Sequence, residues 1–231
     1  MDEIVERFDL DSSLVDSSLP LNWNIAPTNE IYIIRDLQNQ RVLDSASWGI
    51  IAPWHKTFSE ARASQSHAIN ARSESIHEKP TFRQAFRTTR CLIPATGYYE
   101  WATSLGEYPP KQPFYISSSQ ENTSLSIAGI WSSWKNENGL EIQSAAIITQ
   151  EAVGKLATIH SRMPVFMQRE RWDLWLDPKN REIENLVELM RSNDPAVGLV
   201  TRPVSPRVNL VANNSSELIA EVDLGQGQTL F

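Results

Sequence analysis

The sequence predicts an α+β fold, because strand-like segments recur through the middle of the chain and short amphipathic helices lie around them. Apolar or alternating runs bounded by polar turns indicate strands, and apolar residues at helical spacing indicate helices. The chain has 231 residues, 41% of them hydrophobic, which is enough to bury a core of its own. We therefore expect a folded protein built from one large domain or two small ones.

Helices are predicted where apolar residues recur every three or four positions. Residues 2–9 combine this spacing with acidic residues in the first turn. In residues 82–87, Phe82 and Phe86 would face inward. Thr149 is expected to cap the next helix. The later helical segments are 151–157, 169–176 and 181–191.

Strands are predicted from short apolar or alternating runs between turn residues. Residues 90–101 combine an apolar strand, a turn at 95–97 and a second strand that carries Glu100. The tail, residues 210–231, is polar and acidic, and only residues 218–222 are suited to docking. The other predicted strands are 30–35, 41–51, 113–117, 125–131, 143–149 and 198–204.

Cysteine usage and the absence of a long apolar run indicate a cytoplasmic protein. Cys91 is the single cysteine, which excludes an internal disulfide framework and a zinc site of several cysteines. No run has the length of a membrane span, and the acidic N-terminus is unlike a signal peptide. We expect a reducing, cytoplasmic location and no membrane partner.

The charge distribution predicts a local basic surface on an acidic protein. The net charge is −7 and the pI is about 5.2, which argues against a general affinity for nucleic acid. Residues 51–91, however, contain seven Lys and Arg residues against three Glu residues, a local charge of +4. This basic island is suited to a phosphate backbone; the alternative is a charge-balanced helix face around Arg83 and Arg87.

The stretch 66–74 is predicted to be a strand with one polar face. Alternation places Asn70, Arg72 and Glu74 on the same side. An amide can hold an oxyanion or a sugar hydroxyl, and a guanidinium can bind a phosphate or a carboxylate with two donors. The alternative is a solvated strand face on which Arg72 and Glu74 form a surface pair.

Two loops contain large residues of the kind found in ligand sites. Trp48 and Trp54 flank a loop with a glycine and a proline, and they are either core residues or a stacking platform for unpaired bases. Asn24 and Trp23 lie in the loop 21–28, which is either a ligand loop or a turn anchored by a buried tryptophan.

Glu100 and His160 are the candidate acid–base residues. Glu100 lies between Tyr99 and Trp101, and aromatic neighbours desolvate a carboxylate and raise its pKa. His160 stands close to Arg162 on a loop that ends in a proline, which suits proton transfer. The alternatives are an exposed strand glutamate and a structural histidine.

Nine short motifs occur in order over nearly the whole chain: NIAPT, WGIIAPW, INARSE, CLIPATGYYEW, KQPFYI, AGIW, IITQEA, IHSRMPV and PVSPRVN. Together they resemble the SRAP family of abasic-site processing proteins, and the match is highly specific. The resemblance implies one α+β domain over residues 1–231, with a β-barrel-like antiparallel core and peripheral helices. It also implies a positive groove that binds single-stranded DNA and a site that traps abasic sites covalently. We expect no cofactor and no metal.

The resemblance also assigns roles to individual residues. Asn70 would position the sugar and the N-terminal amine, Glu100 would shuttle protons, and His160 would protonate the opening sugar oxygen. The residues that resemble DNA contacts or line the same cleft are Asn24, Trp48, Pro53, Arg72 and Arg162.

The sequence departs from the family pattern at its N-terminus. The family nucleophile is a cysteine directly after the initiator methionine, in an opening of the form MCGRF, whereas Asp2 stands here. Such a cysteine offers an amine and a thiol that close on an aldehyde as a thiazolidine, and an internal cysteine has no free amine. We expect that Met1 begins after the family's first strand, through a truncated or misassigned start.

Three functions remain open at this point. The first is a crosslinking enzyme whose native chain begins upstream with a cysteine, and the second is a catalytically inactive binder of single-stranded DNA. The third is a peptidase or other hydrolase built on Glu100 and His160, although no serine elbow or metal-ligand spacing supports it. For the first two, the partner is single-stranded DNA with abasic sites, and we expect a monomer.

Overall fold

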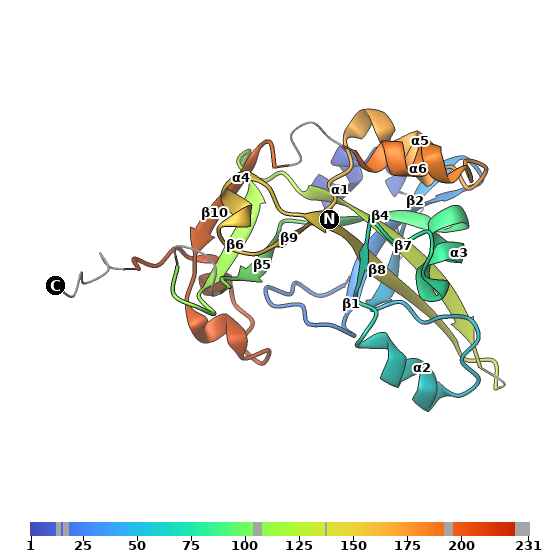
Figure 1. Ribbon diagram of the computed structural model, residues 1–231, viewed down its shortest axis with the longest axis horizontal. Helices are drawn as coiled ribbons and strands as arrows, with labels where there is room; N and C mark the ends of the chain where they lie inside the picture. The colour runs from blue at the N-terminus through green and yellow to red at the C-terminus, as the bar shows by residue number, and fades with distance from the viewer. Residues whose placement is uncertain (13–14, 16–18, 104–107, 137, 192–195, 225–231) are drawn as a thin grey trace.

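Five strands of the protein close into a barrel. The computed structural model describes residues 1–12, 15, 19–103, 108–136, 138–191 and 196–224 (Figure 1). The strand order is β2–β1–β4–β7–β8, and β8 pairs again with β2. All of these pairings are antiparallel except the parallel pairing of β8 with β2, so the barrel closes through its one parallel contact. The strands are β1 (Glu30–Leu37), β2 (Gln40–Trp48), β4 (Arg90–Ala95), β7 (Leu125–Lys135) and β8 (Glu141–Glu151).

Alternate residues of the barrel strands face two different cores. Ile34 and Leu92 pack outward, in one cluster with residues of the surrounding helices. Ile33 and Cys91 face the other way, in a cluster whose buried members all lie on barrel strands, so this cluster fills the interior. Gly129 faces the same interior, where a Cβ would lie 2.9 Å from Cys91 Sγ. The α+β class and the barrel-like core are therefore confirmed.

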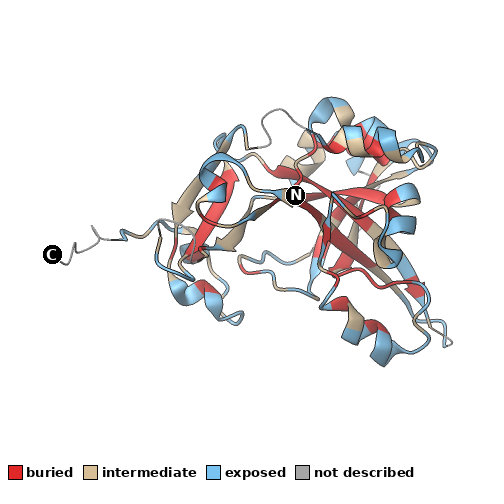
Figure 2. Ribbon diagram, viewed as in Figure 1, coloured by how far each residue is buried: buried red, intermediate tan, exposed pale blue. Residues whose placement is uncertain are grey.

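Helices cover the outer face of the barrel, and Figure 2 shows the buried strands beneath them. Phe86 and Trp175 are fully buried in this layer, as the inward position predicted for Phe86 requires. The covering helices are α1 (Asp2–Arg7), α3 (Pro80–Thr88), α5 (Trp172–Leu176) and α6 (Ile183–Met190). Short 3₁₀ helices are η2 (Arg169–Arg171), η3 (Pro206–Asn209) and η4 (Ser216–Ile219).

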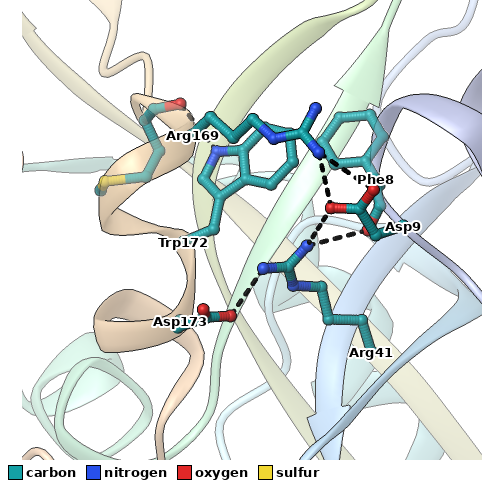
Figure 3. Close-up of polar contacts among 7 residues, drawn as sticks. Phe8, Asp9, Arg41, Arg169, Trp172 and Asp173 are labelled. Carbon is teal, nitrogen blue, oxygen red and sulfur yellow. Dashed lines mark hydrogen bonds and ion pairs between the residues drawn. The ribbon is translucent and has the colours of Figure 1, made fainter.

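Helix α1 is fixed to the barrel by stacked rings and paired charges (Figure 3). Phe8 stacks on Trp172 with ring centroids 4.7 Å apart. Arg41 and Arg169 both donate hydrogen bonds to Asp9, and their guanidinium groups lie 5.4 and 5.8 Å from the Trp172 ring. We call this group the α1 anchor, and its members are Phe8, Asp9, Arg41, Arg169, Trp172 and Asp173.

The segment 90–101 forms two strands, but they do not make a hairpin. β4 pairs within the barrel, whereas β5 (Gly97–Trp101) pairs with β6 (Pro113–Ser118) in a second sheet of order β10–β6–β5, where β10 is Leu199–Pro203. A Cβ on Gly97 would lie 2.4 Å from the Tyr115 hydroxyl, so a glycine is needed where the chain crosses between the sheets. The predicted turn therefore changes sheets and does not close a hairpin.

Two helix predictions need correction. β8 continues to Glu151, so only α4 (Gly154–Ala157) forms in the predicted helix 151–157. Thr149 is a strand residue paired with two neighbouring strands, and its predicted capping role is wrong because these pairings satisfy its backbone. Helix α2 (Phe58–Gln65) was not predicted, because it lacks an apolar stripe and begins instead with a capping box of Thr57 and Glu60.

The C-terminal tail is docked in the way its apolar stretch predicts. Leu218 is buried, Glu221 bridges to Val204, and Val222 N donates to Pro203 O. Residues 225–231 of the predicted tail lie outside the described residues.

Candidate functional site

The structure brings Glu100 and His160 into contact from segments 60 positions apart in the sequence. Their closest atoms, His160 Nδ1 and Glu100 Oε2, are 3.7 Å apart. Strand β5 carries Glu100, and the loop after α4 carries His160. This loop is held in place because Thr103 N donates to Ile159 O and His160 N donates to Leu156 O. We call these two residues the Glu100–His160 pair.

Burial sets the electrostatics of the pair. The Glu100 side chain is 25% exposed and that of His160 is 31% exposed. Loss of solvent raises the pKa of Glu100, which agrees with the expectation from its aromatic neighbours, while the charge of His160 opposes that rise. The pKa of Tyr98, which packs on Phe166, is also raised by burial and by the Glu100 charge. A carboxyl group of this kind can take up a proton more readily than an exposed one.

His160 is oriented by the backbone of Arg162. Arg162 N donates to His160 Nδ1 at 3.1 Å, which requires a lone pair on Nδ1 and places the proton of the neutral ring on Nε2. In the protonated ring, Nδ1–H instead faces Arg162 O at 3.2 Å and the Glu100 carboxylate. Of the described residues, none gives His160 a hydroxyl or thiol hydrogen-bond partner, so the described residues show no serine or cysteine hydrogen-bonded to this histidine.

Arg162 is held by a carboxylate and a strand carbonyl. It lies on β9 (Arg162–Pro164), which pairs with the end of β8. Its guanidinium donates to both oxygens of Glu74 at 2.7 and 2.9 Å and to Thr149 O at 2.7 Å. The hydrogen bonds from Arg162 lower the pKa of Glu74. The surface pair considered between Arg72 and Glu74 does not form, because Glu74 follows the strand in a turn and binds Arg162.

Asn70 and Arg72 lie on the short strand β3 (Asn70–Arg72), beside the same end of β8. Ala71 between them is buried, whereas both polar residues are exposed, as strand alternation predicts. β3 pairs with residues 147–149 of β8, and β9 pairs with residues 149–151, so the two short strands attach to consecutive parts of one strand. Neither Asn70 nor Arg72 hydrogen-bonds through its side chain to another described residue, which leaves the amide and the guanidinium available to a ligand.

The remaining predicted contacts lie in three different settings. Asn24 is buried, and its amide donates to the carbonyls of Val208, Leu210 and Asn213, so it ties its loop to the C-terminal segment. Trp48 is half-buried against the barrel interior and donates to Ile69 O. Pro53 is exposed, and Trp54 beside it has an exposed fraction of 52%.

One member of the basic island is structural. Arg90 is buried, and its guanidinium donates to carbonyls of Phe86 and Trp175. Burial lowers its pKa to about 10. The island therefore presents less positive charge than the sequence count predicts, and no periodicity in the sequence distinguishes Arg90 from its exposed neighbours.

Among the described residues, no three His, Cys, Asp or Glu side chains lie together in a way that could hold a metal ion. In the same part of the chain, no helix has the length and apolar character needed to cross a membrane.

Comparisons with known proteins place these residues in a family context. A family model described as SOS response associated peptidase (SRAP) matches residues 1–211. The abasic site processing protein YoqW of Bacillus subtilis (strain 168) is 35% identical over 219 residues, which are 94% of each chain. The abasic site processing protein HMCES of Rattus norvegicus is 29% identical over an alignment of 211 positions, which covers 80% of this chain and 58% of the relative.

Solved structures share the fold. A protein from Bacteroides thetaiotaomicron has a TM-score of 0.80 at 24% identity, and the match covers 95% of this chain and 94% of the other. A protein from Bordetella bronchiseptica has a TM-score of 0.72 at 25% identity and covers 88% of this chain and 95% of its own. The barrel and its second sheet are therefore a recurring arrangement.

Proposed function

Because the chain belongs to the SRAP family, we propose that it binds single-stranded DNA and acts on abasic sites through the Glu100–His160 pair. The contact between these two side chains carries the proposal, since they are far apart in sequence and half-buried together. Relatives named abasic site processing proteins support the choice of DNA lesion. Asn70 and Arg72, exposed on β3, are the proposed contacts for the sugar and the backbone phosphate.

The proposed chemistry is attack on the aldehyde of a ring-opened abasic site. Protonated His160 donates its Nε2 proton to the ring oxygen while solvent takes the proton of the anomeric hydroxyl, so the sugar opens to the aldehyde, and Glu100 then accepts a proton from the attacking amine. The amine nitrogen bonds to the aldehyde carbon, whose oxygen leaves as water, and an imine results. A thiol on the neighbouring carbon of the amine would then add to the imine carbon and close a thiazolidine.

Cys91 cannot supply that thiol. It is fully buried inside the barrel, and burial raises the pKa of its thiol well above the usual range. The amines of the 231-residue chain are the α-amine of Met1 and the lysines, which form reversible imines. The chain as it stands is therefore proposed to form no heat-stable conjugate, and the burial of Cys91 favours an inactive DNA binder as the second candidate function.

A denaturing gel separates these functions. The 231-residue chain and a variant extended before Met1 by an MCGRF segment and a strand-length linker are incubated with single-stranded DNA that contains an abasic site. We expect a heat-stable conjugate from the extended variant only. A heat-stable conjugate from the shorter chain, or none from the extended variant, contradicts the proposal. The same DNA without the lesion is the control.

The role of Glu100 is tested in the extended variant. Glu100→Gln keeps the shape of the side chain and removes the proton acceptor, so the rate of conjugate formation should fall by about 100-fold. Glu121→Gln, at an exposed turn outside the site, is the matched control and should leave the rate unchanged. Equal rates for the two variants would rule out a proton-transfer role for Glu100.

Other properties stay predictions. We propose that residues 1–231 form one domain that acts as a monomer in the cytoplasm. Light scattering on the purified chain would test the monomer: a mass of about twice the 26.2 kDa of the chain would contradict it.

A further inference from the structure

A pocket lies between helix α1, the β6–β7 turn, the segment after β9 and the start of β10, apart from the Glu100–His160 pair. Its volume is about 240 Å³, which suits a small ion or a single functional group better than a drug-sized molecule. The lining is partly polar and includes Arg7, Ser118, Ser119, Gln120 and Ser126. Of the described residues that line the pocket, Arg7 is the charged one.

Arg7 enters this pocket without a hydrogen-bond partner. Its Nε atom is buried and unpaired, and its guanidinium makes no hydrogen bond to another described residue. Its guanidinium carbon lies over the Phe8 ring, 5.8 Å from the ring centroid. Burial lowers the pKa of Arg7, with Glu3 and Arg169 acting in opposite directions. A buried Nε donor without a partner is costly, and a bound anion would supply the missing acceptor.

Ser126, which also lines the pocket, has a second unpaired donor. The residue is 6% exposed, and its Oγ is buried without a partner. Its neighbour Ser124 is different, because Ser124 N and Oγ donate to the two carboxylate oxygens of Glu3 at 2.8 and 2.6 Å. Glu3 is thus occupied by these bonds and does not line the pocket. The unpaired buried groups among the lining residues are therefore Arg7 Nε and Ser126 Oγ, and the Glu3 charge acts on Arg7 from outside the lining.

We propose that this pocket binds a phosphate group, either free phosphate or a phosphate monoester. The three or four oxygens of a phosphate group can accept hydrogen bonds from the Arg7 guanidinium and from the Ser126 hydroxyl. A planar guanidinium is suited to bind phosphate with two hydrogen bonds. Leu125, Phe166 and Leu199 form apolar parts of the lining, which leaves room for a carbon stem beside the phosphate. The proposal does not depend on the reaction with abasic sites.

Isothermal titration calorimetry with inorganic phosphate, at constant ionic strength set with chloride, tests binding directly. A direct measurement is needed because phosphate also stabilises folded proteins in general by exclusion from their surface. Saturable binding by the 231-residue chain is expected. Arg7→Gln should weaken it by at least about tenfold, since a charge-assisted hydrogen bond is lost. Arg191→Gln, at an exposed arginine directly after α6, is the matched control and should bind as the unchanged chain does.

Ser126→Ala gives a second and independent test. Because Ser126 Oγ has no partner, its removal should leave the unfolding midpoint in phosphate-free buffer unchanged or higher, and should weaken phosphate binding by several-fold. A lower midpoint without phosphate would show that the hydroxyl is already bonded in the free protein, and would count against the proposal. No saturable binding, or equal affinity in Arg7→Gln and Arg191→Gln, would overturn it.

Two sources of the phosphate group are distinguished by one comparison. A short oligonucleotide with a 5′-phosphate and the same oligonucleotide with a 5′-hydroxyl are titrated into the chain and into Arg7→Gln. Tighter binding of the phosphorylated strand that is lost in Arg7→Gln assigns the pocket to a nucleic-acid end. Binding of inorganic phosphate alone assigns it to a small phosphate, and both results support the proposal.

Discussion

The α1 anchor and the Glu100–His160 pair both bring opposite charges together, but they differ in how completely those charges are bonded. In the anchor, Asp9 accepts hydrogen bonds from Arg41 and Arg169 at 3.3 and 2.8 Å, and Arg41 also binds Asp173 at 2.6 Å (Figure 3). In the pair, the carboxylate of Glu100 accepts a hydrogen bond from Trp101 N at 3.3 Å, and His160 Nδ1 is 3.7 Å away.

This difference separates a structural role from a reactive one. The anchor satisfies its charges and stacks them on buried rings, so it holds α1 against the barrel. The pair is more buried than Asp9, which is 54% exposed, and yet less completely bonded. A half-buried carboxyl group with unused acceptor capacity is costly for stability and suited to proton exchange. Hydrogen bonding and burial, taken together, thus distinguish the two regions where charge alone does not.

The largest expected effect comes from breaking the anchor. Trp172 is 1% exposed, stacks on Phe8, and donates through Nε1 to Met167 O. Trp172→Ala should lower the free energy of unfolding by about 3–5 kcal/mol, because it leaves a large cavity. Leu174→Ala, at an exposed position of the same helix, should change it by less than about 0.5 kcal/mol. Urea denaturation of both variants measures the difference, and a similar loss in both would mean that the stack is not the anchor.

A smaller effect is expected from Glu74, whose two carboxylate oxygens both accept hydrogen bonds from Arg162. Its pKa is lowered by Arg162, so its stabilising contribution is present above the ordinary value of 4.5 and is lost as the pH falls below that value. Its side chain is 48% exposed, so Glu74→Gln should cost only about 0.5–1 kcal/mol at pH 7. Denaturation at pH 7 and pH 3 should show the two chains converging at low pH; a constant difference would contradict the pairing.

Glu100 should show the opposite pH dependence. Its pKa is raised by burial, so its contribution is favourable below 4.5 and is lost as the pH rises through its folded-state pKa. Glu100→Gln should therefore gain in stability relative to the unchanged chain as the pH rises from 4 to 7. Thermal unfolding across this range measures the trend. If the stability of the unchanged chain instead increased relative to that of Glu100→Gln as the pH rose, the Glu100 carboxylate would have to be well hydrogen-bonded, as that of Asp9 is.

The smallest effect is expected from Arg72, which is exposed and makes no hydrogen bond to another described residue. Arg72→Ala should weaken binding of single-stranded DNA and reduce the slope of log affinity against log salt by about 1, as for the loss of one phosphate contact. Fluorescence anisotropy at several salt concentrations measures both. Arg191→Ala, at an exposed arginine directly after α6, serves as the control. The proposed DNA partner would be contradicted if duplex DNA bound as tightly as single strands, or if the affinity did not change with salt concentration.

Local patterns predicted most of the strands and helices, and they failed where long-range pairing decides. The alternation around Asn70 and Arg72 was sufficient to place both on an exposed face. Thr149 carried a capping signal, but pairing with β3 and β9 keeps it in a strand. Helix α2 shows the reverse case, in which a capping box visible in the sequence identifies a helix that has no apolar stripe.

The sequence was enough to propose which residues form the candidate site, but not which hydrogen bonds they make. The aromatic neighbours of Glu100 in the sequence predicted a raised pKa, and burial of the side chain in the structure raises it. The partners of Arg162 and Asn24 were not predictable, because they lie 88 and 184 or more positions away in the sequence. Such contacts depend on how β3, β8, β9 and the C-terminal segment meet in space.

The most direct test of the account is an NMR titration of the Glu100 side-chain carboxyl carbon in the unchanged chain and in His160→Gln. We predict an apparent pKa above the ordinary value of 4.5, and a further rise in His160→Gln, because the imidazolium charge that favours the carboxylate is then absent. A Glu100 that titrates at its ordinary value, with no response to His160→Gln, would contradict the central claim that these two side chains form one proton-transfer pair.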